Sequence, residues 1–232
     1  MAAIRGLIFD KDGTLFDFRA TWGGWARRVV GELSEGSAER AAALSRELGF
    51  DLDTGDFQPD SPVIAHTPRE IAEIIRPLLP GKDPAILTER LNLAAAETEM
   101  VETVPLAPLF HTFSALGLRV GLATNDSEHA AKLHLMRGGI DRYFGFVAGF
   151  DSGHGAKPDP GQLLAFALSQ GLKAEEIAMV GDSRHDLVAA KAAGMRGVAV
   201  LTGIARAPEL APHADAVLPD IGHLPAWIST VR

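Results

Sequence analysis

Cysteine is absent from the 232 residues of this sequence. Disulfides, thiol nucleophiles and cysteine-ligated zinc are therefore excluded, and nothing points to an oxidising compartment. Basic residues are also fewer than acidic ones, with 22 Lys and Arg against 30 Asp and Glu and a formal net charge of −8. This balance argues against nucleic acid and against anionic membranes as partners, because both favour basic surfaces.

A long apolar run is missing as well. No uncharged stretch reaches the roughly 20 residues that cross a bilayer. The first six residues lead directly into a short apolar segment and not into the core of a signal peptide. Hydrophobic residues make up 47% and charged residues 22% of the chain, a globular balance that argues against disorder. We expect a soluble, cytoplasmic protein, and the sequence predicts no particular oligomeric state.

Short apolar segments alternate with amphipathic stretches over most of the chain. Five segments have the continuous apolar character of buried parallel strands: 7–9, 120–123, 146–148, 177–180 and 198–201. The stretches between them are closed by glycines, the residue type suited to a helix C-terminus. The pattern predicts an α/β fold with a doubly wound, Rossmann-like parallel sheet covered by helices on both faces.

Residues 17–102 differ from the rest by their helix-start signals and their few β-branched runs. Residues 67–70 have the form of a capping box with proline at the first helical position, and Asp83-Pro84 opens another helix. Because this region follows the first predicted strand, it reads as an insertion into the sheet domain. We expect a helical cap at 17–102 and an α/β core formed by 1–16 and 103–232.

Polar residues follow the predicted strands at the sheet edge where α/β proteins bind ligands. The first strand leads into Asp10-Lys11-Asp12-Gly13-Thr14. Two carboxylates two residues apart, beside a glycine that permits a tight turn, can face one small site. One can attack a substrate while the other transfers protons, and together they can hold a divalent cation. A capped turn is the plain alternative for this segment.

Three further polar groups follow the second and third strands. Thr124 and Asn125 offer a hydroxyl and an amide that suit the oxygens of a phosphoryl group, although helix capping alone explains them better. Lys157 lies in a loop that two prolines stiffen. Its ammonium could neutralise clustered carboxylates and phosphate, whereas a solvated lysine is the default for a loop.

The fourth strand ends in Gly181-Asp182-Ser183. Asp182 would face the same crevice as Asp10 and supply a hard oxygen ligand suited to magnesium. Asp186, one turn along the next helix, could orient Lys157, and simple helix capping is again the alternative. Together the four segments are far more specific than each one alone, because their chemical types are complementary and each follows a predicted strand.

In this order and spacing the segments 10–14, 124–125, 157–158 and 181–186 closely resemble the motifs of the haloacid dehalogenase superfamily. The resemblance is to its phosphoglycolate-phosphatase-like branch, which has a helical cap inserted after the first motif. It implies a magnesium-dependent phosphatase that acts on a small phosphorylated metabolite, phosphoglycolate-like or a sugar phosphate. The reaction would pass through an aspartyl-phosphate.

The resemblance also implies functions for individual residues. Asp10 would be the nucleophile, and Asp12 the general acid and then the general base. Three residues would bind the phosphate: Thr124, Asn125 and Lys157. The ligands of Mg²⁺ would be the side chains of Asp10 and Asp182 and the backbone carbonyl of Asp12. Two further residues would lie next to these groups without touching the substrate or the metal: Ser183 and Asp186.

Three residues depart from the commonest pattern of the superfamily. Lys11 replaces an apolar residue between the two carboxylates. Asp126 adds an acid beside the phosphate-binding pair, where it could weaken phosphate binding or select a substrate. Ala107 stands where glycine is frequent.

The cap offers few signals for substrate choice. Arg19, His66 and Arg69 could meet an anionic substrate, although a lone cap arginine is more often a surface residue. Trp22 and Trp25, three residues apart, are expected to pack the cap core and not to stack on a substrate.

Other activities of the same superfamily stay open to different degrees. A dehalogenase is disfavoured, because it needs neither an acid at position 12 nor a metal. A phosphonatase would use a cap lysine as a Schiff base. The only lysine of the cap region is Lys82, which lies late in that region, and this argues against a phosphonatase. A sugar phosphomutase remains an alternative, since it shares the core chemistry.

Two alternatives come from outside the superfamily. A serine esterase using Ser183 with 220–223 would place its parts too close in sequence and leave Asp10, Asp12 and Lys157 without a function. A phospho-aspartate receiver module uses similar residues around magnesium, but it is much shorter and has no helical insertion. A silent binding protein is disfavoured because both Asp10 and Asp12 are present.

Overall fold

In the computed structural model, which describes residues 3–231, six parallel strands form one sheet in the order β3-β2-β1-β4-β5-β6. The predicted parallel α/β fold is confirmed. The strands are β1 Gly6–Phe9, β2 Arg119–Ala123, β3 Phe146–Ala148, β4 Ile177–Gly181, β5 Arg196–Val200 and β6 Ala216–Leu218.

The central strand β1 is buried along its whole length, as its continuous apolar sequence requires. Its last residue, Phe9, lies beside Leu122 of β2 and Val180 of β4. The residues that follow these three strands therefore meet at one edge of the sheet. The chain order reverses at β1, with β2 and β3 on one side and β4 to β6 on the other. Such a switch point is where open parallel sheets bind ligands.

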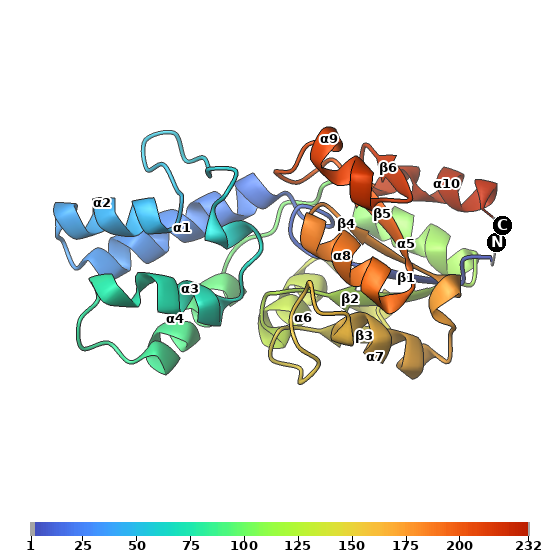
Figure 1. The fold of residues 1–232 in the computed structure, drawn as a ribbon, viewed down its shortest axis with the longest axis horizontal. Coiled ribbons are helices and arrows are strands. Elements are labelled where there is room, and N and C mark those ends of the chain that lie inside the picture. Colours follow the sequence, from blue (N-terminus) through green and yellow to red (C-terminus); the bar gives the residue numbers. More distant parts are fainter. Residues whose placement is uncertain (1–2, 232) are drawn as a thin grey trace.

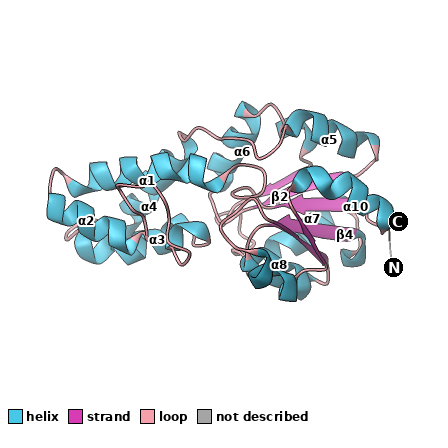
Figure 2. Cartoon of the chain, turned by 90° about the horizontal axis from the view of Figure 1, so that it is seen from above, coloured by secondary structure: helices cyan, strands magenta, loops and turns pink. Residues whose placement is uncertain are grey.

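Helices cover both faces of the sheet (Figure 2), and α5, α6 and α10 share a hydrophobic cluster with one face while α7 and α8 share another with the opposite face. Close packing sets local sequence choices: a Cβ at Gly121 of β2 would lie 2.6 Å from the ring of Phe166 in α7. The helices of this part are α5 Leu106–Ala115, α6 Glu128–Arg137, α7 Gly161–Gln170, α8 Arg184–Ala193, α9 Ala207–Leu210 and α10 Leu224–Thr230.

The first four of the α-helices between β1 and β2 form a separate lobe beside the sheet (Figure 1). Thr67 and Glu70 make the predicted capping box at the start of α3, and Asp83 caps α4, which confirms both expected helix starts. The lobe has its own hydrophobic cluster, which reaches Ala130 of α6. The bounds are α1 Phe18–Ser34, α2 Ala38–Glu47, α3 Pro68–Ile75 and α4 Pro84–Ala96.

Short 3-10 helices join several of these elements: η1 Pro62–Ile64, η2 Arg76–Leu78, η3 Asp141–Tyr143, η4 Ala174–Glu176, η5 Ala211–His213 and η6 Ile221–His223. The sequence pattern did not predict β6, a three-residue edge strand that is only half-buried and therefore lacks a strong apolar signal. The fifth strand ends at Val200, one residue earlier than expected. Within residues 3–231, no helix combines the length and the apolar character needed to span a membrane.

Candidate active site

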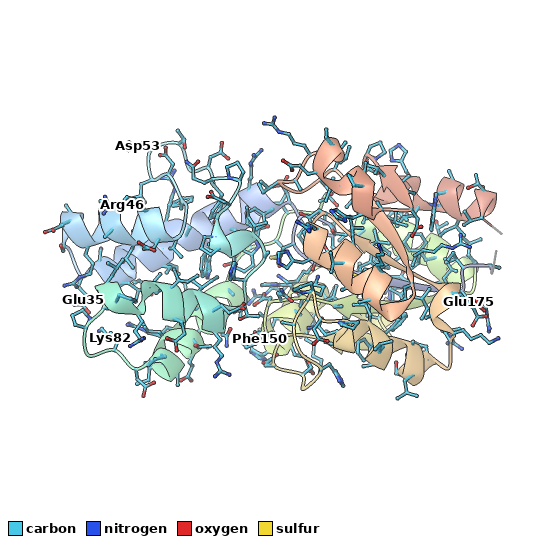
Figure 3. The ribbon with its side chains drawn as sticks, viewed as in Figure 1. Glu35, Arg46, Asp53, Lys82, Phe150 and Glu175 are labelled. Atoms are coloured by element: carbon cyan, nitrogen blue, oxygen red, sulfur yellow. The ribbon has the colours of Figure 1, made fainter. Side chains whose placement is uncertain are left out.

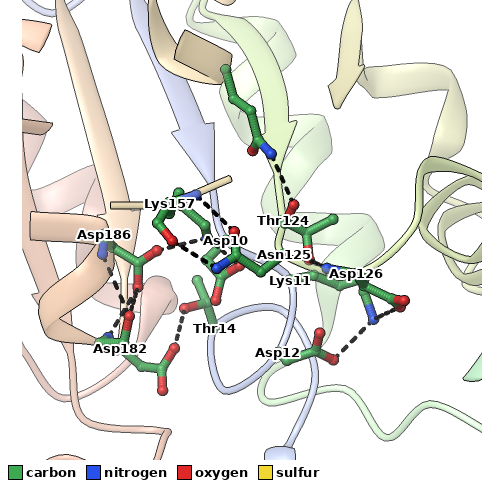
Figure 4. Close-up of polar contacts among 12 residues, drawn as sticks. Asp10, Lys11, Asp12, Thr14, Thr124, Asn125, Asp126, Lys157, Asp182 and Asp186 are labelled. Carbon is green, nitrogen blue, oxygen red and sulfur yellow. Dashed lines mark hydrogen bonds and ion pairs between the residues drawn. The ribbon is translucent and has the colours of Figure 1, made fainter. Parts of the chain in front are cut away.

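Lys157 joins the ends of two strands at the switch point (Figure 4). Its Nζ lies 2.6 Å from Oδ1 of Asp10, which follows β1, and 2.7 Å from Oδ1 of Asp186 in α8. The lysine side chain itself is buried. The three residues are far apart in sequence, and the parallel sheet brings them together as the strand-end pattern predicted.

A group of three buried acids surrounds this contact. Carboxylate oxygens of Asp10, Asp182 and Asp186 all lie within 4.8 Å of one another. The loops close tightly over Asp182, since a Cβ would lie 2.4 Å from its carboxylate at Gly13 and 1.7 Å from it at Gly203. Glycine at these positions leaves the carboxylate room to face Asp10.

The charges of this group are not balanced within the protein. Burial raises the pKa of Asp10 to about 7, against the opposing effect of Lys157 and with support from Asp186 and Asp12. Burial also raises the pKa of Asp182 well above its usual range, with Asp10 and Asp186 adding to the effect. Although burial opposes its charge, the two carboxylates beside it keep the pKa of Lys157 above its ordinary value. With one ammonium for three carboxylates, the group keeps an excess of negative charge, and its carboxylate oxygens are donors that fit a hard divalent cation.

Asp186 holds Lys157 in place. While its Oδ1 contacts the lysine, its Oδ2 accepts hydrogen bonds from the backbone N–H of Ser183 at 3.0 Å and from its hydroxyl at 2.7 Å. The bond from the Ser183 N–H, together with the bond from the Asp186 N–H to the Ser183 hydroxyl at 3.4 Å, forms the capping box that starts α8. One residue therefore caps the helix and orients the ammonium, so both alternatives raised by the sequence are true of Asp186.

Thr124 and Asn125 follow β2 and line a cavity that Asp10, Asp12 and Lys157 also line. The Asn125 side chain is fully engaged, because its Nδ2 donates to the carbonyls of Lys157 at 2.8 Å and Ala65 at 2.7 Å. Its Oδ1 accepts from the backbone N–H of Lys157 at 2.8 Å. Asn125 thus fixes the loop that carries Lys157 and links it to the helical lobe, a function that the sequence pattern did not indicate.

Lys11 and Asp126, two departures from the superfamily pattern, form one ion pair. The Lys11 side chain is fully buried, and its Nζ lies 3.1 Å from Oδ2 of Asp126 and 2.9 Å from Oδ1 of Asp12. Burial raises the pKa of Asp126, with Lys11 opposing that shift. Each unusual residue therefore supplies the charge that the other one needs.

His134 of α6 completes this buried network. Burial, together with the Lys11 charge, lowers the pKa of His134 to about 2, so the imidazole is neutral. Its Nδ1 lies 3.1 Å from Nζ of Lys11, which can only donate. The ring proton is therefore on Nε2, which donates to the carbonyl of Ala95 in α4 at 3.0 Å. Sequence reasoning missed His134, because nothing near it in the chain marks it as part of a site.

Trp22 of α1 reaches the same network from the helical lobe. Its Nε1 donates to Oδ1 of Asp12 at 2.8 Å, and Nζ of Lys11 lies 5.2 Å from its ring centroid. It also packs edge-on against Trp25, with ring centroids 5.2 Å apart. Trp22 is thus part of the lobe's packing, as expected, and in addition contacts a candidate catalytic residue.

The other expected cap residues lie in different places. His66 lines the cavity above Asp10. Arg19 is 3.0 Å from Asp56 in an exposed pair. Arg69 is exposed and is not among the residues that line the cavity. Ala107 lies in the first turn of α5, and nothing in the structure explains alanine in place of glycine there.

The geometry gives no support to a serine esterase. The Ser183 hydroxyl donates to Asp186, while the ring of His223 pairs with Asp220 at 2.9 Å. Among the hydrogen bonds of residues 3–231, none joins Ser183 to a histidine.

A parallel sheet with an acid and lysine site at its switch point, beneath an inserted helical lobe, defines an α/β protein equipped for chemistry on an anionic substrate. More specifically, the chain belongs to the haloacid dehalogenase-like hydrolase family, whose sequence model matches residues 4–194. The resemblance seen in the sequence is confirmed.

Known relatives agree with this assignment. A phosphoglycolate phosphatase of Salmonella typhimurium is 31% identical over 218 residues, a match that covers 86% of this chain and 82% of the relative. A phosphoglycolate phosphatase of Rhodospirillum rubrum is 37% identical over 120 residues, or 52% of this chain and 50% of that protein.

Solved structures share the fold. A haloacid dehalogenase-superfamily phosphatase from Thermococcus onnurineus superimposes with a TM-score of 0.69 at 22% identity, covering 97% of this chain and 98% of the other. CbbY from Rhodobacter sphaeroides, solved in complex with phosphate, gives a TM-score of 0.62 at 24% identity and covers 95% and 96% of the two chains.

Proposed function

We propose that this protein is a magnesium-dependent phosphatase that hydrolyses small phosphomonoesters by way of a phosphoryl group on Asp10. The observation that carries the proposal is the 2.6 Å contact between Nζ of Lys157 and the Asp10 carboxylate. Family membership and relatives named as phosphoglycolate phosphatases support the reaction type.

The first chemical problem is charge. A carboxylate and a phosphate about 4 Å apart repel by roughly 4 kcal/mol at an effective dielectric of about 20. Each ~1.4 kcal/mol costs a factor of ten in rate, so uncompensated repulsion would suppress the reaction. The Lys157 ammonium offsets part of this charge where the phosphoryl group would lie.

Bond making and breaking would then use the two carboxylates after β1. An oxygen of Asp10 attacks phosphorus while the bond to the leaving oxygen breaks and Asp12 protonates that oxygen. Asp12 next takes a proton from the water that attacks the phospho-aspartate, which releases inorganic phosphate and restores Asp10. The hydrogen bond from Trp22 and the contact with Lys11 hold the Asp12 carboxylate for both transfers.

Magnesium would be held by the side chains of Asp10 and Asp182 and by the backbone carbonyl of Asp12. When bound, it supplies positive charge that keeps Asp10 ionised and offsets the charge of the phosphoryl group. Thr14 donates to Oδ1 of Asp182 at 3.4 Å and helps to orient that carboxylate.

Phosphate recognition would rest on the Thr124 hydroxyl and the Lys157 ammonium. Asn125 contributes by holding the Lys157 loop, because its amide group already has three partners within the protein. We further propose that residues 17–102 act as a cap over a core of 1–16 and 103–232, and that the substrate is a small metabolite of the cytoplasm.

The test is hydrolysis of p-nitrophenyl phosphate by the purified protein. We expect turnover with Mg²⁺, loss of turnover in EDTA, and none above background in Asp10→Asn. Asp141→Asn, at an exposed position outside the site, is the matched control and is expected to keep full activity. Undiminished activity in EDTA or in Asp10→Asn would rule the mechanism out.

A further inference from the structure

The cavity above Asp10 has two unlike walls. The wall on the sheet side carries the carboxylates, Lys157 and Thr124 described above. The wall formed by the helical lobe is mainly apolar and aromatic, and its main residues are Trp22, Trp25, Val63, Ile64, Ile71 and Leu91, with His66 as its ionisable member. In the proposed reaction the phosphoryl group lies at the first wall, so the group esterified to it must face the second.

The apolar wall offers no permanent positive charge. Within residues 3–231, no lysine or arginine of the helical lobe lines the cavity. Arg19 contacts Asp56 at the surface, and Lys82 contacts Glu35 at 2.9 Å. Figure 3 shows Lys82 and Glu35 together at the end of the lobe that is remote from the sheet. The cations of the lobe thus lie outside the site.

His66 of the lobe also lines the cavity, but it is exposed to water and so adds no buried charge to the apolar wall. The other basic groups lie on the sheet side. Lys157 is already engaged by Asp10 and Asp186 and would serve the phosphoryl group. His185 is half-buried at the cavity, where burial lowers the pKa of its imidazole and keeps it neutral. Asp12 and Asp126 line the cavity as well, and they would repel a second anion.

We propose that this site selects phosphomonoesters whose alcohol is uncharged and largely apolar, and that it discriminates against alcohols bearing a carboxylate. This inference rests on the proposed phosphatase function and deepens it. A carboxylate placed against indole and aliphatic side chains loses its hydration and gains no partner, whereas an apolar group removes wall surface from water. Phosphoglycolate carries such a carboxylate, and within residues 3–231 the lobe side of the cavity offers no lysine or arginine to pair with it.

The experiment compares phosphoglycolate with its amide, 2-phosphooxyacetamide, which has nearly the same size but no second charge. Benzyl phosphate serves as the apolar substrate. We expect kcat/KM to be highest for benzyl phosphate and at least about tenfold higher for the amide than for phosphoglycolate, the factor that one unpaired polar group costs. Equal or better turnover of phosphoglycolate than of the amide would overturn the inference.

Two variants separate the wall from other causes. Ile64→Arg places a guanidinium in the half-buried part of the wall and is expected to raise kcat/KM for phosphoglycolate relative to the amide. Leu93 of α4 is 54% exposed and does not line the cavity, so Leu93→Arg adds the same charge outside the wall and should leave the ratio unchanged. If no ester is hydrolysed in an Asp10-dependent manner, the phosphatase proposal fails and this inference with it. If hydrolysis depends on Asp10 but phosphoglycolate is preferred, only the inference fails.

Discussion

The pair of Lys11 and Asp126 shows how two unusual residues can explain each other. Considered alone, Lys11 places a charge where the superfamily usually has an apolar residue, and Asp126 adds a negative charge that would weaken phosphate binding. In the fold they neutralise one another at 3.1 Å. The sequence revealed that each was unusual and that each follows a predicted strand, but a shared sheet edge does not specify which of its side chains form a pair.

We expect Lys11→Met to lower the free energy of unfolding by about 3 kcal/mol, since it leaves Asp12 and Asp126 without their buried cation. Adding Asp126→Asn removes one of those charges, so the double variant should recover at least about 1 kcal/mol of the loss. Urea unfolding measures both. Arg28→Met, which breaks an exposed pair with Glu97, is the control and should change stability by about 0.5 kcal/mol or less. Strictly additive effects at positions 11 and 126 would refute the coupling.

At the scale of elements, the parallel strands explain why so much of the site was predictable. Residues that directly follow β1, β2 and β4 must share one edge, whatever the length of chain between them. Capping signals marked α3 and α4 for a similarly local reason. The helix contacts that reach the site, such as Trp22 on Asp12, depend on how two separate packing units meet, and no local pattern encodes that.

Helix α1 contacts Asp12, the proposed acid and base, through the hydrogen bond from Trp22. Trp22→Phe keeps the ring but removes the 2.8 Å bond to Asp12, so we expect kcat to fall about tenfold with a smaller change in KM. The matched control is Trp25→Phe. The Nε1 of Trp25 makes only a 3.5 Å contact with the carbonyl of Leu91, so its loss should matter less. Equal losses in both variants would show that Trp22 acts by packing alone.

At the scale of the whole molecule, the site joins loops that follow distant strands, so a bound cation should stabilise the entire fold. The raised pKa of Asp10 sets the sign of the pH dependence. The metal-free fold favours the protonated carboxyl, so this group's contribution to stability falls as pH rises from about 4 to about 7. Magnesium must displace that proton at low pH and meets none at higher pH.

We therefore expect Mg²⁺ to raise the melting temperature more at about pH 8 than at about pH 6. Differential scanning calorimetry with and without the cation measures the shift. Asp182→Asn, which removes a proposed ligand, should abolish the gain at both values of pH. A shift in the wild type that is independent of pH would contradict the assignment of Asp10 as a ligand.

Gly203 belongs to the site although it has no functional group to offer. Because a Cβ at this position would lie 1.7 Å from the Asp182 carboxylate, every other residue would have to push that carboxylate aside or move the loop. We expect variation at 203 to damage the proposed cation site, although glycine itself offers no side-chain ligand. The volume left free by the missing side chain at 203 is therefore required for the position of the Asp182 carboxylate.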